Sequence, residues 1–180
     1  MEQTALLVID VQQSFEQRDY WRESHVPTWQ NRQSALINAA RQHNWPVIFI
    51  YHNEDSGVFS PASGFVKPID FIDRRENDPV FNKRVHNALT DSGLQEYLQS
   101  NGIGKLLISG IRTEQCCETT ARVASDFGYA VDFVLDATLT FSMQHPASNE
   151  MVSAELISSR TELVLANRFA KIRCSKDYDT

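Results

Sequence analysis

Cysteine is scarce in this sequence, and the few cysteines present form no framework. Three occur in 180 residues, and two of them, Cys116 and Cys117, are adjacent. Such a set cannot build the disulfide scaffold of a small secreted domain, so we expect reduced thiols and a cytoplasmic protein. No two cysteines are separated by two residues, and no Cys/His cluster has zinc spacing. The cysteine pattern therefore predicts no metal site.

Positive charge and long apolar runs are also lacking. Lys and Arg number 17 against 23 Asp and Glu, which gives a formal net charge of −6. This balance disfavours nucleic acid or an anionic membrane as a partner. No apolar run approaches the length of a membrane span, and residues 1–4 lack the basic region of a signal peptide. The 42% hydrophobic content is ordinary for a soluble globular protein, and we expect one domain over residues 1–180.

Short apolar segments alternate with amphipathic ones along the chain. The apolar segments predict buried strands, and their continuous character is typical of parallel sheets. Helical spacing separates them, so we expect an α/β protein, a three-layer α/β/α sandwich with a mostly parallel central sheet. The polar tail from Arg168 is expected to fray or to pack on a partner. The predicted strands are 5–9, 47–51, 80–85, 105–109, 130–135 and 162–166, and the predicted helices are 31–43, 92–100, 113–127 and 146–159.

Cys116 follows a predicted strand, at the start of a predicted helix. Gly110 ends the strand, and Thr113 can cap the helix by accepting a backbone N–H group. A thiol in the first turn experiences the helix dipole and unpaired N–H groups, which lower its pKa and can stabilise an oxyanion. The pattern therefore favours a nucleophile. A free cysteine is nevertheless most often a small core residue, and spacing alone does not choose between Cys116 and Cys117.

Asp10 is the second candidate, because it directly follows the buried strand 5–9. Open α/β sheets place their sites at the carboxyl ends of strands. Taken alone, Asp10 is better explained as a residue that simply starts a turn. Together with Cys116 it indicates a site at one edge of the sheet.

Several short motifs occur in a characteristic order along the chain. They are Leu-Leu-Val-Ile-Asp-Val-Gln with Phe15, Phe-Asn-Lys-Arg at 81–84, Ser-Gly-Ile-Arg-Thr-Glu-Gln-Cys at 109–116, Thr-Ala-Arg at 120–122, and Asp136-Ala137 after a strand. With these motifs the chain resembles the isochorismatase-like cysteine hydrolase superfamily over nearly its whole length. The resemblance implies a triad of Asp10 as general base, Lys83 as its partner and Cys116 as nucleophile.

The resemblance also bears on the turn before the predicted helix. Gly110 stands six residues before Cys116, as in the family pattern, which favours Cys116 over Cys117. The family implies a cis peptide bond between Ile111 and Arg112. By the same comparison, the backbone N–H groups of Arg112 and Cys116 would form an oxyanion hole.

Two departures from the family pattern narrow the prediction. By resemblance, the nicotinamidase branch of the family carries a metal site made of an Asp-x-His motif and a further His. Residues 51–55 of this chain contain one His, His52. The comparison therefore implies no structural metal and disfavours nicotinamide as substrate.

Arg112 stands where the family usually has a small residue. In one interpretation it points away and pairs with an acid; in the other it enters the pocket and selects an anionic substrate.

The loops that should meet above Cys116 supply the candidate pocket wall, although each side chain alone is equally consistent with plain packing. The long segment 52–79 is expected to be an ordered loop near the site. The candidates are Gln12, Phe15, Tyr20, Trp21, His52, Phe59 and Phe65.

These features predict hydrolysis of a small-molecule amide through a Cys116 thioester, without a cofactor, by a protein that the family implies is a homo-oligomer. One alternative is a vinyl-ether or ester hydrolase on the same scaffold. The other is a non-catalytic binding or redox-sensing protein that uses the Cys116–Cys117 pair, although adjacent cysteines in a helix fit a disulfide poorly.

Overall fold

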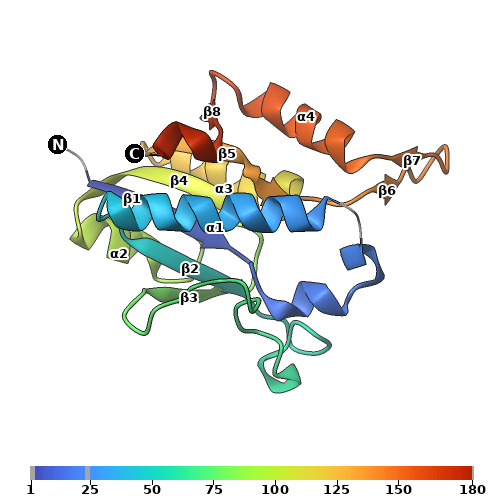
Figure 1. Cartoon of the computed structure of the whole chain (residues 1–180), viewed down its shortest axis with the longest axis horizontal. Coiled ribbons are helices and arrows are strands. Elements are labelled where there is room, and N and C mark those ends of the chain that lie inside the picture. Colours follow the sequence, from blue (N-terminus) through green and yellow to red (C-terminus); the bar gives the residue numbers. More distant parts are fainter. Residues whose placement is uncertain (1–2, 23–24, 180) are drawn as a thin grey trace.

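A central parallel sheet organises the chain. The computed structural model describes residues 3–22 and 25–179. Six strands lie in the order β3-β2-β1-β4-β5-β8, and each neighbouring pair is parallel. They are β1 Gln3–Ile9, β2 Val47–His52, β3 Val80–Lys83, β4 Ile103–Ile111, β5 Ala130–Leu139 and β8 Lys171–Arg173 (Figure 1).

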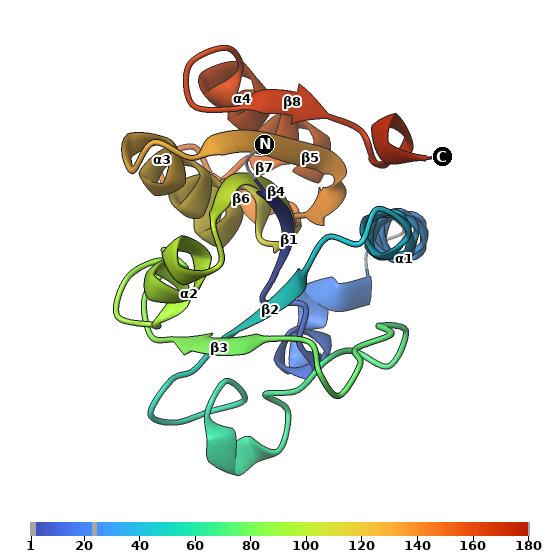
Figure 2. The ribbon, with the colours of Figure 1, turned by 90° about the vertical axis from the view of Figure 1, so that its left-hand side faces the viewer.

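Helices cover both faces of this sheet, as Figure 2 shows. Helix α1, Val26–Gln42, lies on one face, and α2, Leu94–Ser100, and α3, Glu118–Asp126, lie on the other. Successive strand residues point to opposite faces. Thus Leu6 and Val8 pack in the core beneath α1, whereas Leu7 and Ile9 pack beneath α2 and α3. The predicted α/β/α sandwich is confirmed.

The segment between β2 and β3 folds back onto the residues that follow β1. Gln13 N donates to Lys67 O at 2.9 Å, and Ser14 N donates to Phe65 O at 3.1 Å. Short 3₁₀ turns occur at Gln13–Gln17, Asp19–Arg22, Pro61–Ser63 and Ser175–Tyr178. The expected ordered loop is therefore held by backbone hydrogen bonds beside the end of β1.

The C-terminal elements differ from the prediction. The predicted helix at 146–159 and the predicted strand at 162–166 are wrong. Residues 143–152 instead form a small hairpin of β6, Met143–Gln144, and β7, Met151–Val152. Helix α4 then spans Ala154–Leu165. Ser153 begins this helix, because its Oγ accepts the Leu156 N–H at 3.3 Å. Apolar side chains at three- and four-residue spacing keep residues 162–165 helical, in place of the expected strand.

The polar tail is also part of the fold. β8 lies at the edge of the sheet, where it pairs with β5. An edge strand needs no continuous apolar run, so the polar sequence of β8 did not indicate a strand. Beyond it, Tyr178 is buried and its hydroxyl donates to Asp132 Oδ2 at 2.7 Å.

Helix α1 begins at Val26, earlier than the predicted Asn31. Within residues 3–22 and 25–179, no helix is both long and apolar enough to cross a bilayer.

Candidate active site

Three neighbouring strands deliver polar side chains to one edge of the sheet. Asp10 follows β1, while His52 and Lys83 are the last residues of β2 and β3 and lie side by side in the register. Asp10 adopts a left-handed backbone, with φ of 55°, and its N–H donates to Ile50 O at 2.8 Å. Non-glycine residues rarely adopt this conformation, and such strain gathers at functional sites.

Cys116 comes from the connection between β4 and α3. The peptide bond between Ile111 and Arg112 is cis, and a π-helical turn, Thr113–Cys117, leads into the helix. Gly110 has a φ of 124°, and a Cβ atom there would lie 2.0 Å from Ile9 O. Only glycine allows β4 to approach β1 this closely.

Thr113 does not cap the helix, contrary to our prediction. The residue before the π-helical turn is Arg112, and no side chain caps this end. The Thr113 hydroxyl instead donates to Thr138 Oγ1 at 2.9 Å, which ties the turn to β5. A tertiary hydrogen bond to the neighbouring strand thus replaces the local one that the sequence pattern indicated.

Lys83 joins the two other candidate residues. Its Nζ lies 2.8 Å from Asp10 Oδ2 and 3.4 Å from Cys116 Sγ. Asp10 and Lys83 are each 1% exposed and Cys116 is 7% exposed. Asp10 Oδ1 is buried and has no hydrogen-bond partner among the described residues. The structure therefore brings the three residues together around one ammonium group and leaves one carboxylate oxygen ready to accept a proton.

The Cys116 thiol is not activated in the way that its sequence position predicted. Burial, and then the negative charge of Asp10, raise the pKa of Cys116, while Lys83 acts in the opposite direction. Burial by itself lowers the pKa of Lys83, but the charges of Asp10 and Cys116 outweigh it, so the pKa of Lys83 is raised. The resting site therefore holds a neutral thiol beside a carboxylate–ammonium pair, and the expectation of a lowered thiol pKa is wrong.

A cavity of about 170 Å³ opens onto Cys116 and Asp10. Of the predicted pocket residues, Phe15, Tyr20, His52 and Phe59 line it. Arg112 also lines it, as one of the two interpretations from the sequence proposed. Sequence reasoning missed three further lining residues, Glu54, His86 and Gln115. Two of them are close in sequence to predicted residues: Gln115 precedes Cys116, and His86 follows Lys83 by three residues.

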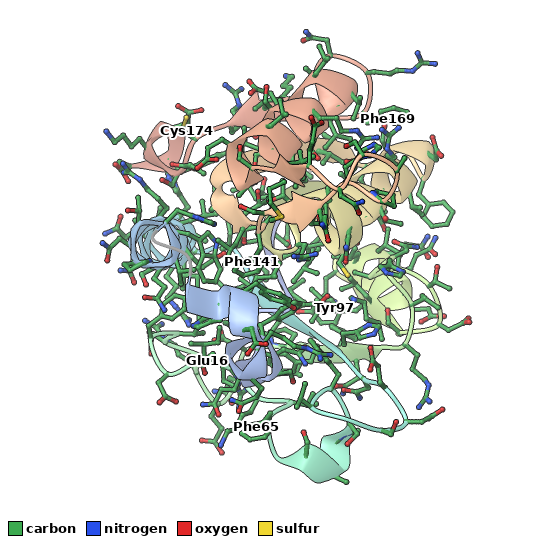
Figure 3. All side chains as sticks on the ribbon, turned by 90° about the vertical axis from the view of Figure 1, so that its right-hand side faces the viewer. Glu16, Phe65, Tyr97, Phe141, Phe169 and Cys174 are labelled. Atoms are coloured by element: carbon green, nitrogen blue, oxygen red, sulfur yellow. The ribbon has the colours of Figure 1, made fainter. Side chains whose placement is uncertain are left out.

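The other three predicted pocket residues, Gln12, Trp21 and Phe65, do not line this cavity, and each has a structural contact of its own. Gln12 Oε1 accepts the His52 N–H at 2.8 Å, so it positions the end of β2. Trp21 packs edge-on against Trp29, with ring centroids 6.1 Å apart. Phe65 lies with the segment between β2 and β3, towards the lower end of the view in Figure 3, and its carbonyl accepts the Ser14 hydroxyl at 3.1 Å.

His52 is a neutral wall residue of the cavity. Burial and then the positive charge of Lys83 lower the pKa of His52. Its Nδ1 lies 3.3 Å from Lys83 Nζ, and its Nε2 lies 3.7 Å from Glu54 Oε1. Across residues 3–22 and 25–179, no three His, Cys, Asp or Glu side chains are grouped so that they could hold a metal ion.

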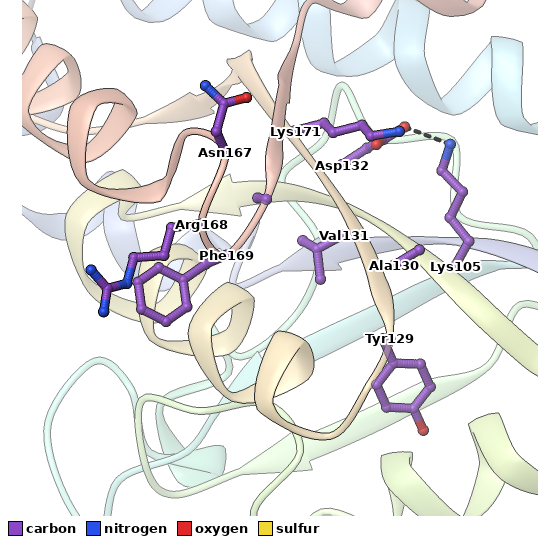
Figure 4. Close-up of a pocket in the computed structure, with 10 residues that line it drawn as sticks. Lys105, Tyr129, Ala130, Val131, Asp132, Asn167, Arg168, Phe169 and Lys171 are labelled. Atoms are coloured by element: carbon purple, nitrogen blue, oxygen red, sulfur yellow. Dashed lines mark ion pairs between the residues drawn. The ribbon is translucent and has the colours of Figure 1, made fainter.

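A larger cavity, of about 450 Å³, lies at the opposite edge of the sheet (Figure 4). Its wall comes from Lys105 on β4, from residues 129–132 at the start of β5 and from residues 167–171 that lead into β8. It includes an ion pair in which Lys105 Nζ lies 2.6 Å from Asp132 Oδ2. No cysteine lines it. Unlike this cavity, the smaller one combines a nucleophile, a carboxylate and a cation in its wall.

Comparison with known proteins finds similar sequences and structures over most of the chain. A family model described as an isochorismatase domain matches residues 4–161. The isochorismatase family protein YrdC of Bacillus subtilis is 28% identical over 95% of this chain and 91% of its own length. Nicotinamidase 3 of Arabidopsis thaliana is 31% identical over 77% of this chain and 74% of its own length. The crystal structure of a putative isochorismatase from Burkholderia xenovorans is 27% identical, with a TM-score of 0.87 over 99% of this chain and 86% of that one.

Proposed function

The chain belongs to the isochorismatase family of hydrolases, and from that premise we propose that it is a cysteine hydrolase that cleaves the C–N bond of a small amide. The observation that carries the proposal is the position of Lys83 Nζ, within reach of both Asp10 Oδ2 and Cys116 Sγ, and these two partners line one cavity. The similarity to a protein named as a nicotinamidase supports an amide as substrate.

Asp10 acts as the general base in this proposal. The raised pKa of Cys116 means that the thiol must lose its proton during the reaction, and the unpartnered Asp10 Oδ1 is a suitable acceptor. Lys83 stays protonated, because its pKa is raised, and it compensates the charge of whichever neighbour is anionic. The proton thus moves within a buried cluster whose net charge does not change.

The bond changes then follow a two-step acyl transfer. Sulfur attacks the amide carbonyl carbon, a tetrahedral oxyanion forms, and protonated Asp10 returns the proton to the nitrogen as the C–N bond breaks. A water molecule, deprotonated by Asp10, next attacks the thioester carbonyl. As the C–S bond breaks, Asp10 returns this proton to sulfur, and the acid product and the free thiol are released. We assign oxyanion stabilisation to the backbone N–H groups of Arg112 and Cys116, which stand at the turn that presents the nucleophile. No step requires a cofactor.

The test measures ammonia or amine release over a panel of small amides. Wild type is compared with Cys116→Ala and with Cys117→Ala, a matched control because Cys117 is fully buried and does not line the cavity. We expect turnover that Cys116→Ala abolishes and Cys117→Ala largely preserves. Turnover that survives in Cys116→Ala contradicts the thioester mechanism and favours a vinyl-ether or ester hydrolase. If none of the three proteins releases ammonia or amine, and the thiols oxidise reversibly, the redox-sensing alternative is favoured.

We further propose that the protein is a cytoplasmic homo-oligomer. Its three cysteines are free thiols, which suits a reducing compartment. Leu156 and Leu163 on α4 are 62% and 78% exposed and line an apolar groove together with Met143 and Val152. Large apolar patches are uncommon on monomers, so a second copy is the occupant that we propose. Light scattering of wild type and Leu163→Arg tests this: an oligomer that the substitution dissociates is expected, and a wild-type monomer contradicts it.

A further inference from the structure

Arg112 lies in the wall of the small cavity, beside Cys116. Its guanidinium carbon is 4.9 Å from the centre of the Tyr20 ring and 5.2 Å from that of Phe141. Its Nη1 is 3.5 Å from Met143 Sδ. Two aromatic rings and a thioether thus hold the guanidinium in one place, and one of these rings, Tyr20, lines the cavity itself. A planar cation held in this way is suited to recognition of a planar anion.

The hydrogen-bonding capacity of this guanidinium is largely unused. The nearest carboxylate oxygen, Glu114 Oε1, is 3.7 Å from Nη1, and neither Glu114 oxygen has a hydrogen-bond partner among the described residues. Arg112 Nε is buried and also lacks a partner there. Buried donors are normally satisfied, so an incompletely paired guanidinium beside a cavity indicates a missing acceptor. Each interpretation from the sequence therefore holds in part: Arg112 lies in the cavity wall, and it forms a 3.7 Å ion pair with Glu114 that includes no hydrogen bond.

The Lys83 ammonium is already paired, at 2.8 Å from the Asp10 carboxylate. Glu54 is half-exposed and carries a negative charge. Arg112 is the guanidinium that lines the cavity, and its 3.7 Å ion pair with Glu114 includes no hydrogen bond, so it keeps hydrogen-bonding capacity for a ligand. The volume of about 170 Å³ is below the ~300–1,000 Å³ of pockets for drug-sized ligands, so the ligand must be compact.

We propose that Arg112 is a specificity-determining residue that binds a carboxylate, and that the substrates are small amides carrying an acidic group. The substrate part of this inference rests on the proposed function, whereas the anion subsite does not. The subsite can therefore be tested without turnover, through the alkylation of Cys116.

Iodoacetate and iodoacetamide are matched probes, because they differ only in a carboxylate against an amide. The measured quantity is the ratio of their second-order rate constants at Cys116, followed by mass mapping in a Cys174→Ser background that removes the exposed thiol. N-acetylcysteine provides the reference ratio. A ratio of two rates on the same thiol cancels any change in the pKa of Cys116 between variants.

We expect the ratio at Cys116 to exceed the reference by about tenfold or more at low ionic strength, as one charge-assisted contact allows. Arg112→Gln should bring it down to the reference, and Arg112→Lys, which keeps the charge but lacks the planar fork, should retain part of the preference. Arg18→Gln is the control, since Arg18 is an exposed cation 5.4 Å from the Phe59 ring that does not line the cavity. It should leave the ratio unchanged.

A wild-type ratio at or below the reference overturns the proposal by itself, even if Arg112→Gln does not fold. An equal fall in Arg112→Gln and Arg18→Gln also overturns it, because the preference is then a general field effect. The result is separable from the proposed function. If iodoacetate is preferred in an Arg112-dependent way but no amide is hydrolysed, the anion subsite stands and the proposed amide hydrolysis is contradicted. If neutral amides are hydrolysed but iodoacetate is not preferred, the proposed function stands and the anion subsite is contradicted.

Discussion

Asp10 shares only one of its two carboxylate oxygens with Lys83. Oδ2 lies 2.8 Å from Nζ, and Oδ1 is buried without a hydrogen-bond partner in the described part of the chain. The pair is nearly inaccessible to solvent, with the Lys83 side chain 0% and the Asp10 side chain 1% exposed. The same contact therefore has consequences for thiol reactivity and for stability, and these can be measured separately.

Asp10→Asn should change two properties of Cys116 in opposite directions. Burial and then the negative charge of Asp10 raise the thiol pKa, so removal of that charge should increase the thiolate fraction and with it the iodoacetamide rate at pH 8, by about tenfold. Amide hydrolysis should fall by about 10²–10⁴-fold, because the general base is lost. Both rates are measured in the Cys174→Ser background. A decrease in both would contradict the assigned role of the carboxylate.

Lys83→Met should destabilise the fold strongly, because it leaves a buried carboxylate without its cation. Loss of one partner of a buried pair costs about 3–5 kcal/mol. In the double variant Asp10→Asn/Lys83→Met most of that loss should be recovered, while hydrolysis stays abolished. Urea unfolding of the two single variants and the double variant measures the coupling. Additive free energies of unfolding would show that the two groups do not interact.

His52 should make stability depend on pH below neutrality. Its pKa is lowered in the folded state, so the unfolded chain binds the proton more readily, and stability should fall as the pH drops from the unfolded value of about 6.5 through the lowered folded value. Above that window the contribution of His52 is constant. His52→Gln should flatten this part of the profile of unfolding free energy against pH. An unchanged slope would mean that another group is responsible.

Gly110→Ala should be far more harmful than alanine at another left-handed glycine. A Cβ at Gly110 would lie 2.0 Å from Ile9 O, whereas one at Gly64, whose φ is 76°, would meet nothing within 4 Å. We expect Gly64→Ala to cost about 1–2 kcal/mol through backbone strain and Gly110→Ala about 4 kcal/mol or more. Denaturant unfolding of both variants gives the difference. Similar losses would show that the clash is relieved by movement of β1.

The central architecture was predictable because its signals are local. Continuous apolar segments such as 5–9 and 47–51 are buried on both faces, as the strands of a parallel sheet require. A residue directly after such a strand lies at its carboxyl edge, so Asp10 and Cys116 could be placed at one edge in advance. The C-terminal elements were not predictable in this way. The edge strand β8 is polar, and the register of α4 depends on which of its side chains meet the rest of the fold.

The sequence by itself determined the fold class, the order of most elements and the residues at the strand ends, because hydrophobic periodicity and chain punctuation depend on neighbouring residues. Only the tertiary structure decided how those residues interact. It showed that Gln12 holds the backbone of His52 instead of lining the cavity, that burial with Asp10 raises the Cys116 pKa, and that Arg112 stays beside the cavity. Side-chain direction, desolvation and charge pairing depend on residues distant in sequence, and folding alone brings these together.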